Sequence, residues 1–174
     1  IKSSAASDVY KRQRMEGILV PYIHGGGKIG VMVRAESPAG AIPEILAAAK
    51  DCALQVAAMN PPYLKREDVP AAVLDEEKKI ILAQMAEDPK MANKPEQVKE
   101  KIAAGKVGKY YGENCLLEQA FVKENKETVQ SYVDGVAKAA GTTIAITAFV
   151  RFERGEGIEK KADNFAEEIA SMIK

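Results

Sequence analysis

Two alternating apolar segments on either side of a glycine-rich turn constrain the fold of this chain more than any other feature. Residues 18–23 and 29–34 carry apolar side chains at every second position, which is typical of half-buried β-strands. Residues 24–28 between them include three consecutive glycines, and glycine tolerates the positive φ angles of a tight turn. Together these segments predict an antiparallel β-hairpin. Pro21 has no backbone N–H to donate, so we expect the first strand near an edge of its sheet.

Two helices and a late strand complete the predicted body of the fold. Apolar residues recur at helical spacing over 42–59 and again over 128–140. Residues 143–153 alternate as a strand does. One face of this strand is predicted to carry Ile144, Ile146, Ala148, Val150 and Phe152. We therefore expect an α+β fold, in which a small antiparallel three-stranded sheet has helices on one face.

The stretch between these parts has a different, more charged composition. Residues 69–87 and 95–110 are charged helical segments, and they predict an antiparallel helical hairpin that projects from the body. The apolar seam expected between its helices is thin and consists of Val73, Ile80, Ile81, Val98 and Ile102. Because so narrow a seam is marginal by itself, we expect the arm to need a partner surface.

These patterns predict a division of the chain into parts. The core would comprise residues 14–68 and 113–158, with the helical hairpin inserted at 69–112 and a helical module at 159–174. Residues 1–13, with no initiator methionine and no hydrophobic period, resemble translated sequencing-adaptor sequence. We expect this segment to be a non-native leader and leave it out of the fold.

Composition excludes several classes of partner. Lys+Arg and Asp+Glu number 25 each among 174 residues, so no net charge favours nucleic acid or a membrane surface. The few aromatic residues do not interleave with a basic patch, and no apolar run reaches the roughly 20 residues of a membrane span. We expect no direct contact with nucleic acid or membrane. Cys52 and Cys115 have no metal-ligand spacing, and a reduced, cytoplasmic location is expected.

Local chemistry argues against an enzyme. Gly25, Gly26, Gly27 and Lys28 could cradle phosphate, but a phosphate-binding P-loop continues into a helix with Ser or Thr after the lysine. Here Ile29 follows and a strand is predicted, so the hairpin turn is the favoured interpretation. The single histidine and the two cysteines cannot build a zinc site. We expect no catalytic residues, no metal and no cofactor; a phosphate-ligand enzyme stays as a minor alternative.

Four segments, in order along the chain, support a resemblance to a known family. They are residues 21–33 (PYIHGGGKIGVMV), 65–69 (KREDV), 121–122 (FV) and 149–172 (FVRFERGEGIEKKADNFAEEIASM). With these segments the chain resembles the carboxy-terminal half of elongation factor Ts, the guanine-nucleotide exchange factor for elongation factor Tu. The resemblance runs collinearly over residues 15–174.

The resemblance implies roles for these parts. The sheet and its helices would dock on the third domain of elongation factor Tu, and the terminal module would reach the GTPase domain. The helical hairpin matches a coiled-coil subdomain used for dimerisation in some members, so a homodimer is a further expectation. The partner-binding residues expected on this basis are His24, Gly25, Phe121, Val122, Ile158 and Phe165. Lys123 stands where some members carry an apolar residue, so we carry no contact over to it.

The resemblance also implies what the sequence lacks. The family's amino-terminal helical domain and its Thr-Asp-Phe-Val segment, which inserts into the GTPase domain, have no match here. A protein that docks without that insertion has little differential affinity for the two nucleotide states, so we expect weak binding and poor exchange. The alternative is an oligomerisation or interaction module built on the helical arm, without exchange activity.

Overall fold

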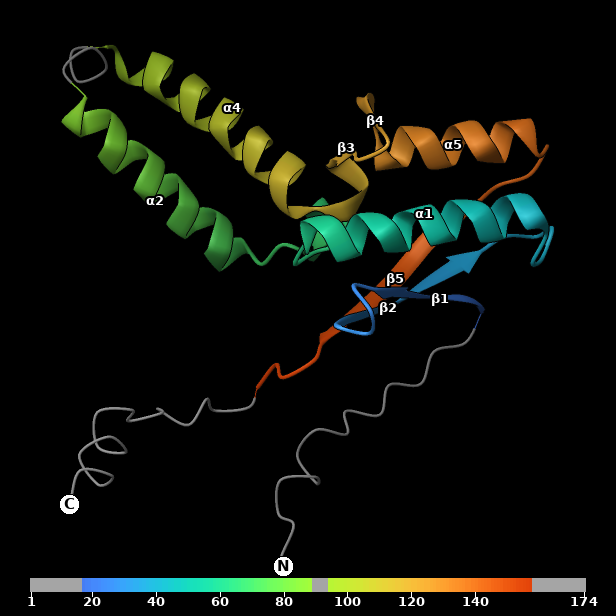
Figure 1. Ribbon diagram of the computed structural model, residues 1–174. Coiled ribbons are helices and arrows are strands. Elements are labelled where there is room, and N and C mark those ends of the chain that lie inside the picture. Colours follow the sequence, from blue (N-terminus) through green and yellow to red (C-terminus); the bar gives the residue numbers. More distant parts are fainter. Residues whose placement is uncertain (1–16, 89–93, 158–174) are drawn as a thin grey trace, which may run out of the picture.

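The structure, a computed structural model, describes residues 17–88 and 94–157, so the predicted leader at 1–13 and the terminal module at 159–174 lie outside the described residues. Its base is a three-stranded antiparallel sheet (Figure 1). The strands are β1 (Ile18–His24), β2 (Ile29–Glu36) and β5 (Ala145–Glu153), and β2 lies in the centre. The chain therefore leaves the sheet after β2 and returns to its far edge only at β5.

The predicted hairpin is confirmed. His24 at the end of β1 pairs with Ile29 at the start of β2, and the two strands stay in register along their length. Residues 25–27 have φ angles of 60°, 63° and 87°, so this turn requires glycine at three consecutive positions. Pro21 lies in β1, an edge strand of the sheet, where its missing N–H leaves no gap in the central pairing.

A β-bulge in β5 overturns one prediction. Residues 146 and 148 pair with neighbouring residues of β2, so Thr147 between them is an extra residue. A single extra residue moves all later side chains to the opposite face of a strand. Ile146 is buried before the bulge, whereas Phe149 packs against the same core after it and Phe152 is exposed. The expectation that one face of this strand carries every second apolar residue from 144 to 152 is therefore wrong.

Both helices of the body lie on the same side of the sheet, and one of them packs directly against it (Figure 1). Helix α1 (Pro43–Met59) packs its small side chains on the sheet, and helix α5 (Val129–Ala139) lies beside α1. The capping residues fit their positions, since Asn60 adopts a left-handed conformation after α1 and the Thr128 hydroxyl accepts a hydrogen bond from Ser131 N at the start of α5. The α+β class with helices on one face is confirmed.

A small ribbon on the far side of α1 was not predicted from the sequence. Strands β3 (Ala120–Phe121) and β4 (Glu124–Thr128) pair antiparallel, with a register shift between the two residues of β3. The ribbon follows the short 3₁₀ helix η3 (Leu116–Glu118) and leads directly into α5. The stretch that the sequence suggested to be a plain connector therefore has its own backbone pairing.

The inserted arm consists of two antiparallel helices, α2 (Ala71–Glu87) and α4 (Glu96–Asn114) (Figure 1). Its hydrophobic cluster is separate from that of the body and contains Ile81, Met85, Ala103 and Val107, with Leu74, Ile102 and Tyr111 packed against it. Of the predicted seam, Ile81 and Ile102 take part, whereas Ile80 and Val98 are exposed. Ile80 is exposed because it lies about 100° around α2 from Ile81, outside the stripe that faces α4.

The fold makes a stability prediction at Leu116, which is fully buried where η3 meets the core. Leu116→Ala should lower the free energy of unfolding by about 2–5 kcal/mol, because truncation leaves a cavity that the core fills only in part. Leu46→Ala, at an exposed position of α1, is the matched control and should cost less than about 1 kcal/mol. Urea unfolding followed by circular dichroism measures both, and equal losses would contradict the packing described.

Candidate partner-binding surfaces

The tip of the β1–β2 hairpin carries the first two predicted contact residues, His24 and Gly25. His24 is exposed, and its Nδ1 lies 3.0 Å from the hydroxyl of Tyr22, two residues earlier on the same face of β1. The two rings also stack at a tilt, with centroids 5.9 Å apart. Tyr22 thus orients the imidazole through Nδ1, and the other ring nitrogen, Nε2, does not contact Tyr22. Gly25 has a φ of 60°, which makes the sharp turn after the histidine possible.

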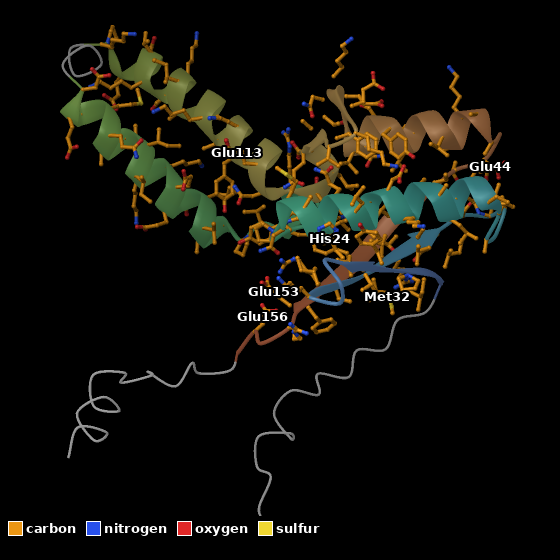
Figure 2. The ribbon with its side chains drawn as sticks, viewed as in Figure 1. His24, Met32, Glu44, Glu113, Glu153 and Glu156 are labelled. Carbon is orange, nitrogen blue, oxygen red and sulfur yellow. The ribbon has the colours of Figure 1, made fainter. Side chains whose placement is uncertain are left out.

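A second tight turn lies against the first at this end of the sheet. Arg154 N donates to Lys28 O at 2.8 Å, which links the turn after β5 to the hairpin turn. The Glu156 carboxylate accepts from Glu153 N at 3.2 Å, and Gly155 has a φ of 90°. Figure 2 shows His24, Glu153 and Glu156 at this same end of the molecule. Two glycine-containing turns therefore form one composite tip, and the described residues end shortly after it, at residue 157.

An exposed apolar row runs from this tip along the outer face of the sheet. Ile23 and Phe152 face the gap above Gly30, because the three residues are paired across β1, β2 and β5 and paired residues share a face. Ile23 is 67% exposed and Phe152 46%. Met32 continues the row on the side away from α1 (Figure 2). Exposed apolar side chains grouped in this way are a candidate interaction surface, since soluble domains seldom expose large apolar patches.

The β3–β4 ribbon carries the next two predicted residues, and the structure treats them differently. The side chain of Phe121 is 3% exposed and stacks on Tyr132 of α5, with ring centroids 4.2 Å apart. Val122 is half-buried, and the exposed Lys123 that follows it pairs with Asp51 of α1 at 2.5 Å. Phe121 thus anchors the segment in the core, and the accessible groups belong to the two residues after it.

The structure does not bring the two predicted contact segments together. The hairpin tip lies on the sheet side of α1, whereas the ribbon lies on the other side of α1, next to α5 (Figure 1). The remaining predicted residues, Ile158 and Phe165, lie outside the described residues. A partner that used both segments would therefore have to reach around α1.

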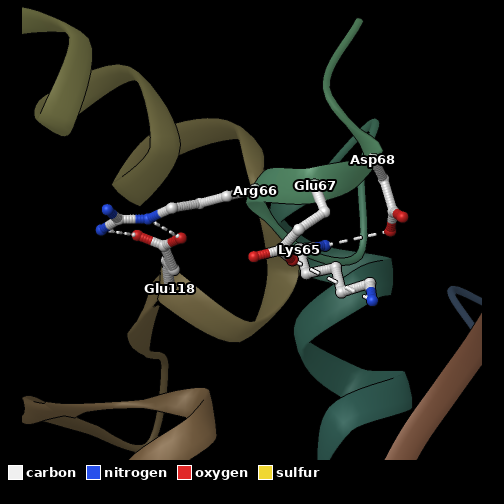
Figure 3. Close-up of polar contacts among 5 residues, drawn as sticks. All are labelled: Lys65, Arg66, Glu67, Asp68 and Glu118. Atoms are coloured by element: carbon white, nitrogen blue, oxygen red, sulfur yellow. Dashed lines mark hydrogen bonds and ion pairs between the residues drawn. The ribbon is translucent and has the colours of Figure 1, made fainter.

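The root of the arm is held by an ion pair between Arg66, in the segment 65–69 that supported the family resemblance, and Glu118. Arg66 binds Glu118 through both carboxylate oxygens, with Nη2 to Oε2 at 2.6 Å (Figure 3). Its guanidinium also lies over the ring of Tyr111, 4.9 Å from the centroid. The backbones of residues 63–64 and 115–117 pair alongside it. The segments that enter and leave the arm are thus joined at its root. The planar guanidinium of Arg66 suits both the carboxylate of Glu118 and the aromatic face of Tyr111.

Other expectations concern chemistry rather than partners. The glycine turn runs directly into β2, so it is a hairpin turn and lacks the strand-to-helix geometry of a P-loop. Within residues 17–88 and 94–157, no three His, Cys, Asp or Glu side chains gather as metal ligands. No helix in that same part of the chain is long and apolar enough to cross a membrane.

Sequence reasoning missed two features of these surfaces. The exposed pair Ile23 and Phe152 depends on the bulge at Thr147, for which the sequence has no clear signal. The hydrogen bonds behind the ribbon come from Gln55 and Asp51 of α1. The sequence carries no clear signal here, because Gln55 lies outside the apolar stripe predicted for this helix and its burial comes from the ribbon.

A family comparison supports the resemblance over most of the chain. The family model described as Elongation factor TS matches residues 7–156, which begins inside the segment 1–13 predicted to be a leader. Proteins named Elongation factor Ts are 47% identical in Clostridium kluyveri over 91% of this chain, 43% in Syntrophotalea carbinolica over 91%, and 45% in a Clostridium botulinum strain over 90%. The chain belongs to the elongation factor Ts family.

The match covers only part of each relative. The aligned region is 50% of the Clostridium kluyveri protein and 51% of the Syntrophotalea carbinolica protein. The chain therefore spans about half the length of the curated relatives it matches.

The two buried cysteines provide a prediction about pH. Burial, followed by the charge of Asp51, raises the pKa of Cys52 to about 12, and burial followed by Glu118 raises the pKa of Cys115 to about 11. At pH 8 both thiols in the folded chain should react with iodoacetamide at least about a hundredfold more slowly than in urea, because the thiolate is the nucleophile. Mass spectrometry of timed samples measures the rates, with free cysteine as the reference.

The same shifts fix the sign of a stability effect. Because the folded pKa values exceed the unfolded ones, the stabilisation from the neutral thiols is complete below about pH 8 and declines as the pH rises through 9 to 11. Equal alkylation rates in the folded and unfolded chain would show that the thiols are not buried as described.

Proposed function

We propose that this chain binds elongation factor Tu and takes part in the exchange of its guanine nucleotide, by supplying docking contacts. The observation that carries this proposal is the identity of 43–47% with proteins named Elongation factor Ts over about nine-tenths of the chain. Nucleotide exchange on elongation factor Tu is the general role of that family. On the same ground we infer a cytoplasmic location.

The hairpin tip suits such docking. Tyr22 holds His24 in one orientation before any partner arrives, and preorganisation of this kind lowers the entropy cost of binding. The neighbouring Ile23 and Phe152 add apolar area that a partner would remove from water. His24 and Ile23 point to opposite faces of β1, so a partner that contacted both would have to close around the tip.

The proposed action requires binding and no covalent chemistry. A protein that binds the nucleotide-free form of a GTPase more tightly than the nucleotide-bound form must weaken nucleotide binding by the same factor. Contacts that are equal in both forms give affinity without exchange. The tip and the ribbon are proposed as contacts of the second kind, so they set how firmly the exchange factor holds its partner. Ile158 and Phe165 remain predicted contacts of the terminal module.

Self-association through the arm is a second candidate function, and one observation favours it. Ile80, Leu82 and Val98 are large apolar side chains exposed on α2 and α4. The arm's own cluster is small, so a second arm packed against the side of α2 that carries Ile80 would bury apolar surface that is now in water. Sedimentation of the chain alone, with and without Ile80→Lys, separates this function from docking.

Removal of the His24 side chain tests the docking proposal. His24→Ala should weaken binding to elongation factor Tu by about tenfold, the loss of roughly 1.4 kcal/mol expected when a hot-spot residue is truncated. Isothermal titration calorimetry on the GDP-bound and nucleotide-free partner gives both affinities. His24→Ala should lower the two affinities by the same factor, because the tip is proposed to contact both forms alike.

Lys50→Ala, at an exposed position of α1 outside the tip, is the control. It should keep the affinity within about twofold, because surface substitutions away from a contact have small effects. Loss of GDP binding by the chain itself in Lys28→Ala would instead support the phosphate-ligand alternative. Failure of the unaltered chain to bind either form, or unchanged binding by His24→Ala, would overturn the docking proposal.

A further inference from the structure

A pair of buried amide side chains lies directly behind the β3–β4 ribbon. Gln55 of α1 and Gln119, which follows η3, are 0% and 1% exposed, and they are the two buried polar residues of the described part of the chain. Gln55 Nε2 donates to Gln119 Oε1 at 3.0 Å and to Ala120 O at 3.1 Å. Gln55 Oε1 accepts from Val122 N at 2.9 Å. One side chain thus satisfies two backbone groups of the segment that carries Phe121.

The backbone fixes the orientation of this pair. Val122 N can only donate and Ala120 O can only accept, so the Gln55 amide fits in one of its two flipped orientations. Gln119 is fixed in turn, because its oxygen must accept from Gln55 while its Nε2 donates to Glu113 O at 2.8 Å. Neither a carboxylate nor an apolar side chain can make this set of bonds.

The β-ladder alone cannot supply these hydrogen bonds. The register between β3 and β4 shifts between Ala120 and Phe121, so regular pairing is interrupted within the segment. Buried backbone groups left without a partner cost free energy, and the Gln55 amide supplies the partners here. Two apolar side chains at these positions would pack as well as the amides or better. What the amides add is a set of hydrogen bonds that fixes the backbone geometry of the segment.

A second anchor on α1 lies one turn before Gln55. Asp51 accepts from Lys123 Nζ at 2.5 Å and from the Tyr132 hydroxyl at 2.8 Å. Burial and then the hydrogen bond to Asp51 raise the pKa of Tyr132, so its hydroxyl remains a donor throughout the physiological pH range. Tyr132 in turn stacks on Phe121. Residues 51 and 55 of one helix therefore hold the segment from both ends.

We propose that Gln55 and Gln119 are positioning residues, which together with Asp51 hold residues 120–123 in the shape that presents Val122 and Lys123 to the protein partner. The inference rests on the proposed docking function. Because Gln119 also binds Glu113 in the last turn of α4, the same pair fixes the segment relative to the root of the arm. The partner surface that fits this segment would present an apolar area to Val122 and a polar area to the Lys123–Asp51 ion pair.

Hydrogen exchange measured by NMR tests the geometry without any partner. In the unaltered chain the amide of Val122 should exchange slowly, whereas that of Lys123 should exchange quickly. Gln55→Met keeps the side-chain volume and removes all three hydrogen bonds, so it should lower the protection of Val122 by about tenfold relative to the amides of β2. Gln130→Met is the matched control, since Gln130 makes its amide hydrogen bond to Asp134 on the exposed side of α5. It should leave Val122 unchanged.

Binding to elongation factor Tu completes the test. Gln55→Met should weaken binding by about tenfold, with the circular dichroism spectrum unchanged, and Gln130→Met should bind as the unaltered chain does. Two results would overturn the positioning role. One is a loss of protection in Gln55→Met that is uniform across all amides. The other is a fast Val122 amide in the unaltered chain, which can be measured even if the variant does not fold. Loss of Val122 protection with full binding would show that the segment is not a contact. If the unaltered chain does not bind at all, the docking proposal fails while the exchange data still decide the geometry.

Discussion

The structure depends on the packing of one helix, α1, which is buried on several sides at once. Its small residues Ala48, Ala49, Cys52 and Ala53 are fully buried and allow the backbone to approach the sheet closely. From its other side, Gln55 and Asp51 reach the ribbon and α5. Sheet, ribbon and arm root come from distant parts of the chain, and α1 is the element that the body's parts share. Both candidate surfaces therefore owe their shape to this helix, although neither lies on it.

The parts of the fold that could be predicted are those with local causes. Three glycines between alternating segments determine a hairpin whatever happens elsewhere, and a proline in β1 restricts that strand to an edge. The bulge at Thr147 has no such local cause, because it arises where β5 must match a strand more than a hundred residues earlier in the chain. The prediction of the residues in the arm's seam was partly wrong for a similar reason. Which of Ile80 and Ile81 faces inward depends on the rotation of α2 against α4, which a short apolar pattern does not determine.

The candidate site divides in the same way. The resemblance led to His24 and Gly25, and the structure places both at an exposed tip. It also led to Phe121, whose side chain is turned inward onto Tyr132, so a role in binding would come through the shape of its segment. The network behind that segment joins residues 64 positions apart, Gln55 and Gln119, so no spacing in the sequence could reveal the pair. Gln55 lies outside the apolar stripe predicted for its helix, so neither its burial nor its partner could be read from the helical pattern.

The tip is a candidate surface for protein contact in a chain of balanced charge. Three of its charged side chains have partners within the chain, since Arg151 pairs with Glu153 at 2.9 Å and Glu156 accepts from the backbone of Glu153. Charges that are already paired offer little net attraction to a charged surface. Burial against a partner would also cost them their favourable interaction with water. The contacts proposed for the tip are the imidazole of His24, on the face of β1 that Tyr22 shares, and the apolar row on the opposite face. Both depend on geometry set elsewhere, the imidazole on Tyr22 and the row on the extra residue in β5. The contacts proposed for this surface are thus consequences of the sheet's register, and a shift of one residue in β5 would remove Phe152 from the row while the sequence of the tip stayed the same.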